Sequence, residues 1–105
     1  MHGQHRGNQT LIDRIVRIAL RSEAASPASL RAAAAQREFE TMAFIAHRIK
    51  GMSANFSAGG LRDLALETES AARAETQGAD ALALRLADLM DEFLAALSAR
   101  VMAPA

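Results

Sequence analysis

The chain has 105 residues, half of them hydrophobic, and twelve basic and twelve acidic residues give it a formal net charge of zero. These values predict one small domain with its own core, and neutrality argues against a nucleic-acid binder. The absence of cysteine excludes a disulfide framework and a thiolate metal site, and it fits a reducing cytoplasm, where we expect the protein to reside. No apolar run is long enough to span a membrane, and no signal peptide is recognisable.

The N-terminal half begins with a polar segment, residues 1–9, that we expect to be flexible. Thr10 is a potential N-cap for a first helix, and an apolar stripe predicts its buried face. That stripe consists of Leu11, Ile15, Ile18 and Ala19, and Ile12, Val16 and Leu20 lie on its flank. A short second helix should follow, with Ser26 as its N-cap and Pro27 at its first helical position.

Three further helices are predicted at about 38–56, 58–75 and 80–100, with Gly78 as the left-handed residue of the last turn. Leu61, Leu64, Ala65, Thr68 and Ala72 form the buried face of the fourth helix, and Leu82, Leu86, Leu89, Phe93 and Leu97 that of the fifth. Short linkers favour antiparallel neighbours. We therefore expect an all-α, up-down antiparallel four-helix bundle over residues 10–101, with an additional short helix on its N-terminal side and a flexible C-terminus at 102–105.

His47 lies in the third helix, on the face opposite the predicted core arc of Met42, Ile45, Ile49, Met52 and Phe56. The residues stacked above and below its imidazole are all small: Ala43, Gly51 and Ala54. A mid-helix glycine costs about 1 kcal/mol relative to alanine, and access for another macromolecule to the ring would offset that cost. The alternatives are a histidine without a function and a glycine that permits close helix packing.

Other side chains near His47 support a functional interpretation of this face. Lys50 places a positive charge within reach of an anion on the imidazole, and Ser53 and Asn55 add polar groups. Phe44 should be an exposed apolar side chain, which is more readily explained at an interface than in water.

The segment AHRIKGMSANFSAGGLRDLALETESAAR, residues 46–73, resembles the signature of histidine-containing phosphotransfer (HPt) domains of multistep two-component signalling. The His-x-x-Lys-Gly core alone is weakly specific, but its combination with SANFSAGGL and an outward histidine is fairly specific. The helix pattern extends the resemblance from about Leu11 to Leu97. Met52 departs from the family, which often has a small residue there, although the helical wheel places Met52 in the core.

The resemblance implies that His47 is the phosphoacceptor, that Lys50 gives electrostatic support, and that Gly51 gives a receiver domain access. Ser53 and Asn55 would shape the motif through local hydrogen bonds. The apolar flank of the first helix resembles the docking surface for receivers, although burial against the second helix explains it equally well. The residues expected to contact the partner are Ile12, Val16, Leu20, Ala43, Phe44, Arg48 and Ala54.

The implied function is that of a phosphocarrier, which takes a phosphoryl group from a receiver's aspartyl phosphate and passes it to another receiver. Neutral imidazole is a competent nucleophile near pH 7, and transfer depends mainly on positioning and charge neutralisation. The receiver would supply magnesium, and the carrier would need no cofactor of its own. No nucleotide-binding motif is present, so we expect no autonomous kinase activity. Receiver domains and a hybrid histidine kinase are the expected partners, and a monomer is favoured over a dimer.

Two alternatives remain from the sequence. A metal-binding bundle would need inward Glu-x-x-His motifs, which the chain lacks, and His2 and His5 are more readily explained as part of a floppy terminus. A phosphorylation-independent interaction module would have the same fold and docking surface, so the sequence does not exclude it.

Overall fold

The computed structural model describes the backbone of residues 2–102 and the side chains of residues 10–101. These residues form five α-helices and no strand, which confirms the all-α class. The helices are α1 His2–Glu23, α2 Ser26–Gln36, α3 Phe39–Ala54, α4 Gly59–Arg73 and α5 Ala79–Met102.

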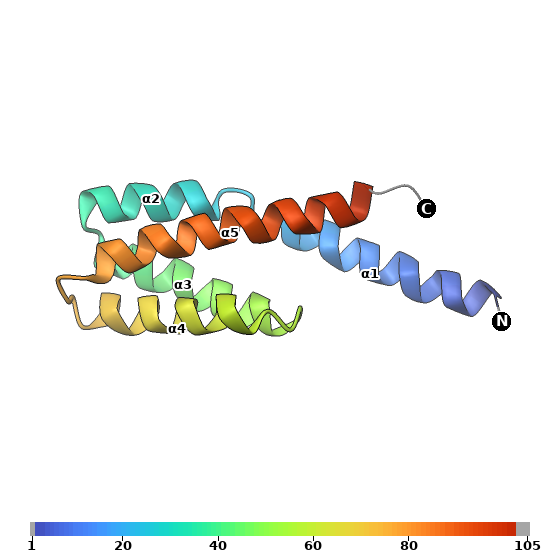
Figure 1. Ribbon diagram of the computed structural model, residues 1–105, viewed down its shortest axis with the longest axis horizontal. Coiled ribbons are helices and arrows are strands. Elements are labelled where there is room, and N and C mark those ends of the chain that lie inside the picture. The colour runs from blue at the N-terminus through green and yellow to red at the C-terminus, as the bar shows by residue number, and fades with distance from the viewer. Residues whose placement is uncertain (1, 103–105) are drawn as a thin grey trace.

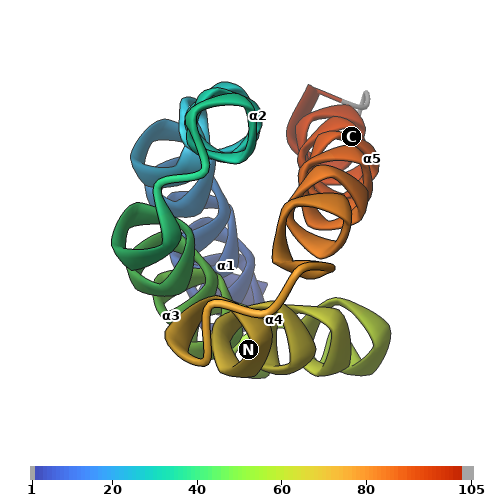
Figure 2. The same ribbon diagram turned by 90° about the vertical axis from the view of Figure 1, so that its left-hand side faces the viewer.

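Helices α2 to α5 form the expected up-down antiparallel bundle. α3 packs against α2 and α4, and α5 closes the bundle by packing against α2 and α4 (Figures 1 and 2). Their facing surfaces bury one continuous core, to which α3, α4 and α5 contribute most of the apolar residues that periodicity predicted. The exceptions are Phe56 and Leu97, which pack in a second core, and Leu82, which is in neither. The largest fully buried side chains of the continuous core are Leu30, Met42, Ile49, Leu86 and Met90.

The helix outside the bundle is α1, which precedes α2 in the chain and lies against the C-terminal half of α5 (Figure 1). It has 22 residues, twice the 11 of α2, which is the helix that the sequence predicted to be short. The second, smaller core holds α1 in place. Val16, Ala19 and Leu97 are buried in this core, and Leu20, Phe56, Phe93 and Val101 pack around them.

The predicted buried face of α1 is largely wrong. Leu11, Ile15 and Ile18 are 55%, 45% and 53% exposed, whereas Val16, from the predicted flank, is only 2% exposed. The apolar face of this helix is wider than its contact with the bundle, so periodicity cannot tell which edge of that face packs. The position of α5 determines which edge is buried, and this is the edge that carries Val16 and Ala19.

Two local predictions about helix starts also need correction. Thr10 is not an N-cap, because α1 begins at His2 and continues through it: nothing in residues 2–9 prevents helical hydrogen bonding. The N-cap of α2 is Ala25, while Ser26 lies inside the helix and its hydroxyl donates to the Glu23 carboxylate at 2.6 Å. Pro27 does occupy the first turn, as expected. Met1 and residues 103–105 lie outside the described residues, and flexibility at the two ends of the chain stays a prediction.

Left-handed backbone occurs at Arg37, Ser57 and Glu75, with φ of 52°, 54° and 52°, and at no glycine among residues 2–102. Gly78 is therefore not the left-handed residue of the α4–α5 turn. Glu75 is, because the chain leaves α4 there by two backbone hydrogen bonds: Glu75 N–H donates to Ala72 and Thr76 N–H to Ala71.

Candidate functional site

His47 projects from α3 toward solvent, with 63% of its side chain exposed. The buried positions of α3, including Met42, Ile45 and Ile49, lie on the other side of the helix. The structure thus confirms the outward placement that the helical wheel predicted. An imidazole in this position is open to a second macromolecule.

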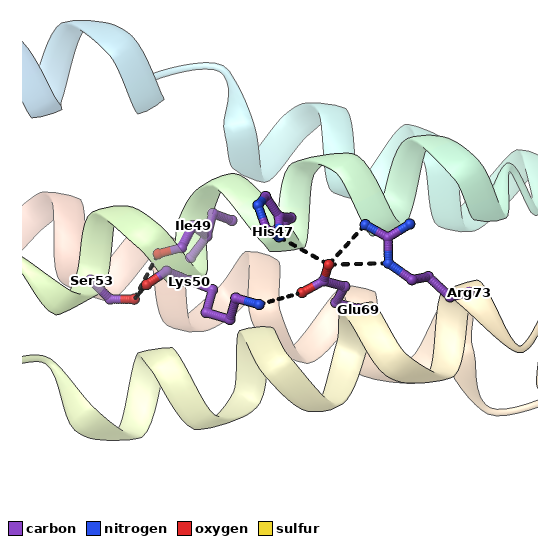
Figure 3. Close-up of polar contacts among 6 residues, drawn as sticks. All are labelled: His47, Ile49, Lys50, Ser53, Glu69 and Arg73. Atoms are coloured by element: carbon purple, nitrogen blue, oxygen red, sulfur yellow. Dashed lines mark hydrogen bonds and ion pairs between the residues drawn. The ribbon is translucent and has the colours of Figure 1, made fainter.

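Glu69 of α4 holds one edge of the ring. Its Oε2 lies 3.0 Å from His47 Nδ1, although 22 residues separate the two in sequence (Figure 3). Only 9% of the Glu69 side chain is exposed, so the carboxylate forms the floor of the site beneath the more exposed histidine. The close packing of α3 against α4 creates this contact.

Two cations converge on the same carboxylate. Lys50 Nζ donates to Glu69 Oε1 at 2.9 Å, and Arg73 donates to Oε2 through Nε at 3.1 Å and a terminal nitrogen at 2.8 Å (Figure 3). Lys50 reaches across from α3, while Arg73 lies one helical turn beyond Glu69 on α4. The site therefore combines a histidine with two positive charges on one carboxylate.

These contacts lower the pKa of Glu69 from its ordinary value of 4.5 to about 2. The hydrogen bond from Lys50 is the main cause, and those from Arg73 and His47 act in the same direction, while burial opposes the shift. Glu69 is consequently ionised at neutral pH and can act only as a hydrogen-bond acceptor.

The ionised carboxylate determines which nitrogen of His47 is free. Because Glu69 offers no proton, the 3.0 Å contact requires Nδ1 to be the donor. In neutral imidazole the lone pair then lies on Nε2. The geometry therefore leaves Nε2 as the nucleophilic atom of the exposed ring.

Gly51 lies one turn after His47 and is exposed. A Cβ atom added there would meet no heavy atom within 4 Å. No neighbouring helix therefore requires the glycine for close packing, which removes that alternative explanation. The small residue leaves space beside the ring instead.

Ser53 makes the local hydrogen bonds expected of it, but it lies inside the bundle and not beside the imidazole. Its side chain is fully buried, and Oγ donates to the carbonyl of Ile49 at 2.6 Å. Asn55 is exposed at the C-cap of α3, and its backbone N–H donates to the Met52 carbonyl at 3.0 Å. Both residues shape the end of α3.

The expected partner contacts fall into two groups. Phe44, 64% exposed, and the exposed Ala54 lie on the face of α3 that carries His47, and Ile12 and Leu20 are partly accessible. Val16 and Ala43 are buried, so these two expectations are wrong: α5 covers Val16, and the end of α4 lies over Ala43. A wheel drawn for one helix cannot show what the neighbouring helix covers.

Arg48 has a structural contact that the sequence did not indicate. Its guanidinium donates to the buried Glu23 carboxylate at 3.2 and 3.3 Å and to Ser26 Oγ at 3.0 Å. It also lies 6.0 Å from the ring centroid of Phe44. Arg48 thus links α3 to the α1–α2 junction by hydrogen bonds, at a position next to His47.

Sequence reasoning missed Glu69 and Arg73 as site residues. A signal was present, since Glu69 directly follows Thr68 at the edge of the predicted buried face, where a carboxylate needs partners. Its partners on α3 could be named only once the rotation of α3 against α4 was known.

Within the described residues, no group of three or more histidine, cysteine or acidic side chains is placed to hold a metal ion. The side chains of His2 and His5 lie outside that range. None of the helices, over the part of the chain described, has a stretch apolar and long enough to span a bilayer.

An α-helical bundle that presents an exposed histidine, held by a carboxylate and flanked by cations, defines a class of protein that carries a group on histidine. Comparison with family models agrees, because the model of the Hpt domain matches residues 10–100. The chain therefore belongs to the Hpt domain family, whose members carry phosphoryl groups on histidine in phosphorelays and interact with receiver domains. Comparisons with curated proteins and with solved structures gave no match.

Proposed function

We propose that the protein accepts a phosphoryl group on Nε2 of His47 from the aspartyl phosphate of a receiver domain and transfers it to a second receiver. The observation that carries this proposal is the contact of Glu69 with Nδ1 of a side chain that is 63% exposed, because in neutral imidazole this contact places the lone pair on Nε2. The exposed Phe44 and the open space at Gly51 support approach of a partner to the same face.

In the transfer step, the Nε2 lone pair attacks phosphorus and a nitrogen–phosphorus bond forms. The bond between phosphorus and the aspartate oxygen breaks, and the carboxylate leaves with the electron pair. Nδ1 keeps its proton, so the ring gains positive charge, which the Glu69 carboxylate stabilises at 3.0 Å. Passing the group to a second receiver reverses these changes.

Lys50 and Arg73 are the residues suited to stabilise the phosphoryl oxygens. Each keeps donors that Glu69 does not use: an ammonium has three protons, and one terminal nitrogen of Arg73 makes no hydrogen bond to that carboxylate. Their charges also offset the negative charge of Glu69 near the incoming group.

The remaining chemistry belongs to the partner. The receiver supplies Mg²⁺ and most of the electrostatic catalysis, so the protein acts as a phosphocarrier without autonomous kinase activity. We place it in the cytoplasm, as a monomer that works with receiver domains and a hybrid histidine kinase.

The experiment that tests this function is transfer of labelled phosphoryl groups from a panel of pre-phosphorylated receiver domains with Mg²⁺. Wild type should gain a label that is labile in acid and stable in alkali, and His47→Gln should gain none. The matched control is His2→Gln/His5→Gln, which changes the other two histidines of the chain and should accept the label normally.

Two results would contradict the proposal. Label on His47→Gln would mean that another residue accepts the group. Binding of receivers without any label on wild type would favour the alternative of a phosphorylation-independent interaction module.

A further inference from the structure

The solvent side of α1 carries two parallel rows of residues that the fold does not use. The apolar row consists of Leu11, Ile15 and Ile18, each about half exposed. The arginine row consists of Arg14, Arg17 and Arg21, all exposed. At about 100° per residue, the two rows lie side by side on the helix, away from the edge that packs on α5.

Among residues 10–101, no carboxylate is paired with the arginine row. None of its three guanidinium groups makes a hydrogen bond or ion pair with any side chain in residues 10–101. The same holds for the scattered Arg62, Arg85 and Arg100, whereas Arg31, Arg37, Arg48 and Arg73 have acidic partners. The row on α1 is distinguished by placing three such arginines on one side of one helix. The acidic residues of α1 are engaged elsewhere: Glu23 is buried against Arg48, and Asp13 already has a partner. An exposed apolar surface bordered by one sign of charge favours a partner with the opposite sign.

This side of α1 is continuous with the face that carries His47. A shallow groove runs between the two helices, lined by Ile15, Ile18 and Ser22 of α1 and by Met52 and Asn55 of α3. Arg48, next to His47 in sequence, bonds to Glu23 at the end of α1. A macromolecule seated over His47 and Gly51 therefore meets the apolar row first and the arginine row at its edge.

We propose that the two rows of α1 select the partner, and that the preferred partner is a receiver domain whose contact surface has an apolar centre with carboxylates on one side. This inference rests on the proposed function. It adds that the charge of a receiver's contact surface determines how well that receiver binds. A second copy of the chain fits less well, because pairing two such faces brings arginine rows together without supplying a carboxylate.

The test measures binding and phosphoryl transfer with two sets of purified receiver domains, one with acidic and one with basic contact surfaces. The variant is Arg14→Glu/Arg17→Glu/Arg21→Glu, and its helix content and thermal unfolding are measured first. With acidic receivers, the variant should lower the transfer rate at limiting receiver concentration about tenfold or more in low salt. The difference should shrink in about 0.5 M salt, because added ions screen exposed charges.

Two matched controls separate charge from structure. The triple substitution of the same residues by lysine keeps the charge and should retain most of the wild-type rate. Arg85→Glu reverses the charge of one exposed arginine on α5, outside the row, and should transfer normally.

Four results would overturn the inference. Equal transfer rates for wild type and the glutamate variant with acidic receivers would show that the arginine row does not select the receiver. The proposed function would still be supported, because transfer itself occurs. If no receiver binds to wild type, both this inference and the proposed function are contradicted. Loss of a wild-type dimer in the glutamate variant, or loss of binding to phosphatidylglycerol vesicles with receiver transfer unchanged, would assign the rows to a second copy or to a lipid surface.

Discussion

At the scale of single residues, Glu69 couples the site to the stability of the protein. Its folded pKa of about 2 lies below its ordinary value of 4.5, so the ionised form stabilises the fold. That stabilisation is complete above about pH 4.5 and is lost as the pH falls toward 2. We expect Glu69→Gln to lower the free energy of unfolding at pH 7 and to flatten its decline between pH 4.5 and 2.

Urea unfolding at a series of pH values measures this effect. Glu67→Gln is the matched control, because Glu67 is exposed on the same helix and makes no ion pair with a described side chain. Parallel pH profiles for wild type and Glu69→Gln would show that the ion pairs of Glu69 do not stabilise the fold.

Gly51 allows a second test at the residue scale. Since an added Cβ meets only open space, Gly51→Ala should raise the free energy of unfolding by about 1 kcal/mol through helix propensity alone. The same substitution should slow phosphoryl transfer, because it narrows the approach to His47. Gly60→Ala, at another open position, should leave the transfer rate unchanged. Loss of stability in Gly51→Ala would revive the explanation that the glycine permits helix packing.

The histidine was predictable from sequence and its carboxylate was not. One helix determines whether His47 faces outward, so counting 100° steps from Met42 to Ile49 was sufficient. The role of Glu69 depends on the rotation and height of α4 relative to α3. These are properties of a helix pair, and no periodicity within either helix encodes them.

At the scale of helices, the end of α4 stores strain at a non-glycine residue. Glu75 adopts a left-handed conformation with φ of 52°, which costs an L-residue about 1 kcal/mol. Glu75→Gly should therefore raise the free energy of unfolding by about 0.5 kcal/mol after the extra entropy of glycine in the unfolded chain is counted.

The neighbouring residue supplies the control for this prediction. Ala74 has φ of −84° and gains nothing from glycine, so Ala74→Gly should lower stability by about 0.5–1 kcal/mol. Thermal or urea unfolding of the two variants measures the contrast. Equal destabilisation by both substitutions would contradict a left-handed turn at Glu75.

The corrected orientation of α1 gives a prediction for this helix as a whole. Val16 is 2% exposed and Ile18 is 53% exposed, although the sequence suggested the opposite. Val16→Ala should cost about 1–3 kcal/mol of stability, while Ile18→Ala should stay within about 0.5 kcal/mol of wild type. Denaturant unfolding measures both, and a larger loss for Ile18→Ala would restore the original prediction.

Helix positions were predicted to within two residues for α3, α4 and α5, because apolar periodicity and a glycine-containing turn mark their ends. The prediction of the buried face of α1 was wrong for a physical reason. Where the apolar face of a helix is wider than the contact that the helix makes, the neighbouring helix and not the sequence pattern determines which edge is buried. The predicted start of α1 at Thr10 was wrong because the polar segment before it contains no proline. Nothing in that segment prevents the helix from beginning earlier, at His2.

At the scale of the whole molecule, the arrangement of α5 determines what the protein presents to a partner. Its 24 residues pack on α2 with one half and on α1 with the other, so α1 lies beside the bundle and borders the face of His47 (Figures 1 and 2). An up-down bundle follows from short linkers, but the placement of α1 depends on the second core around Val16 and Leu97.

The measurement that tests the central claim most directly is the identification of the nitrogen that carries the phosphoryl group on His47. Nuclear magnetic resonance of ¹⁵N-histidine-labelled protein, phosphorylated by a receiver domain, distinguishes the two ring positions through their nitrogen–phosphorus couplings. Because Glu69 binds Nδ1, the group should lie on Nε2. Phosphorylation of Nδ1 would contradict the account, since it requires the contact between His47 and Glu69 to be absent when the reaction occurs.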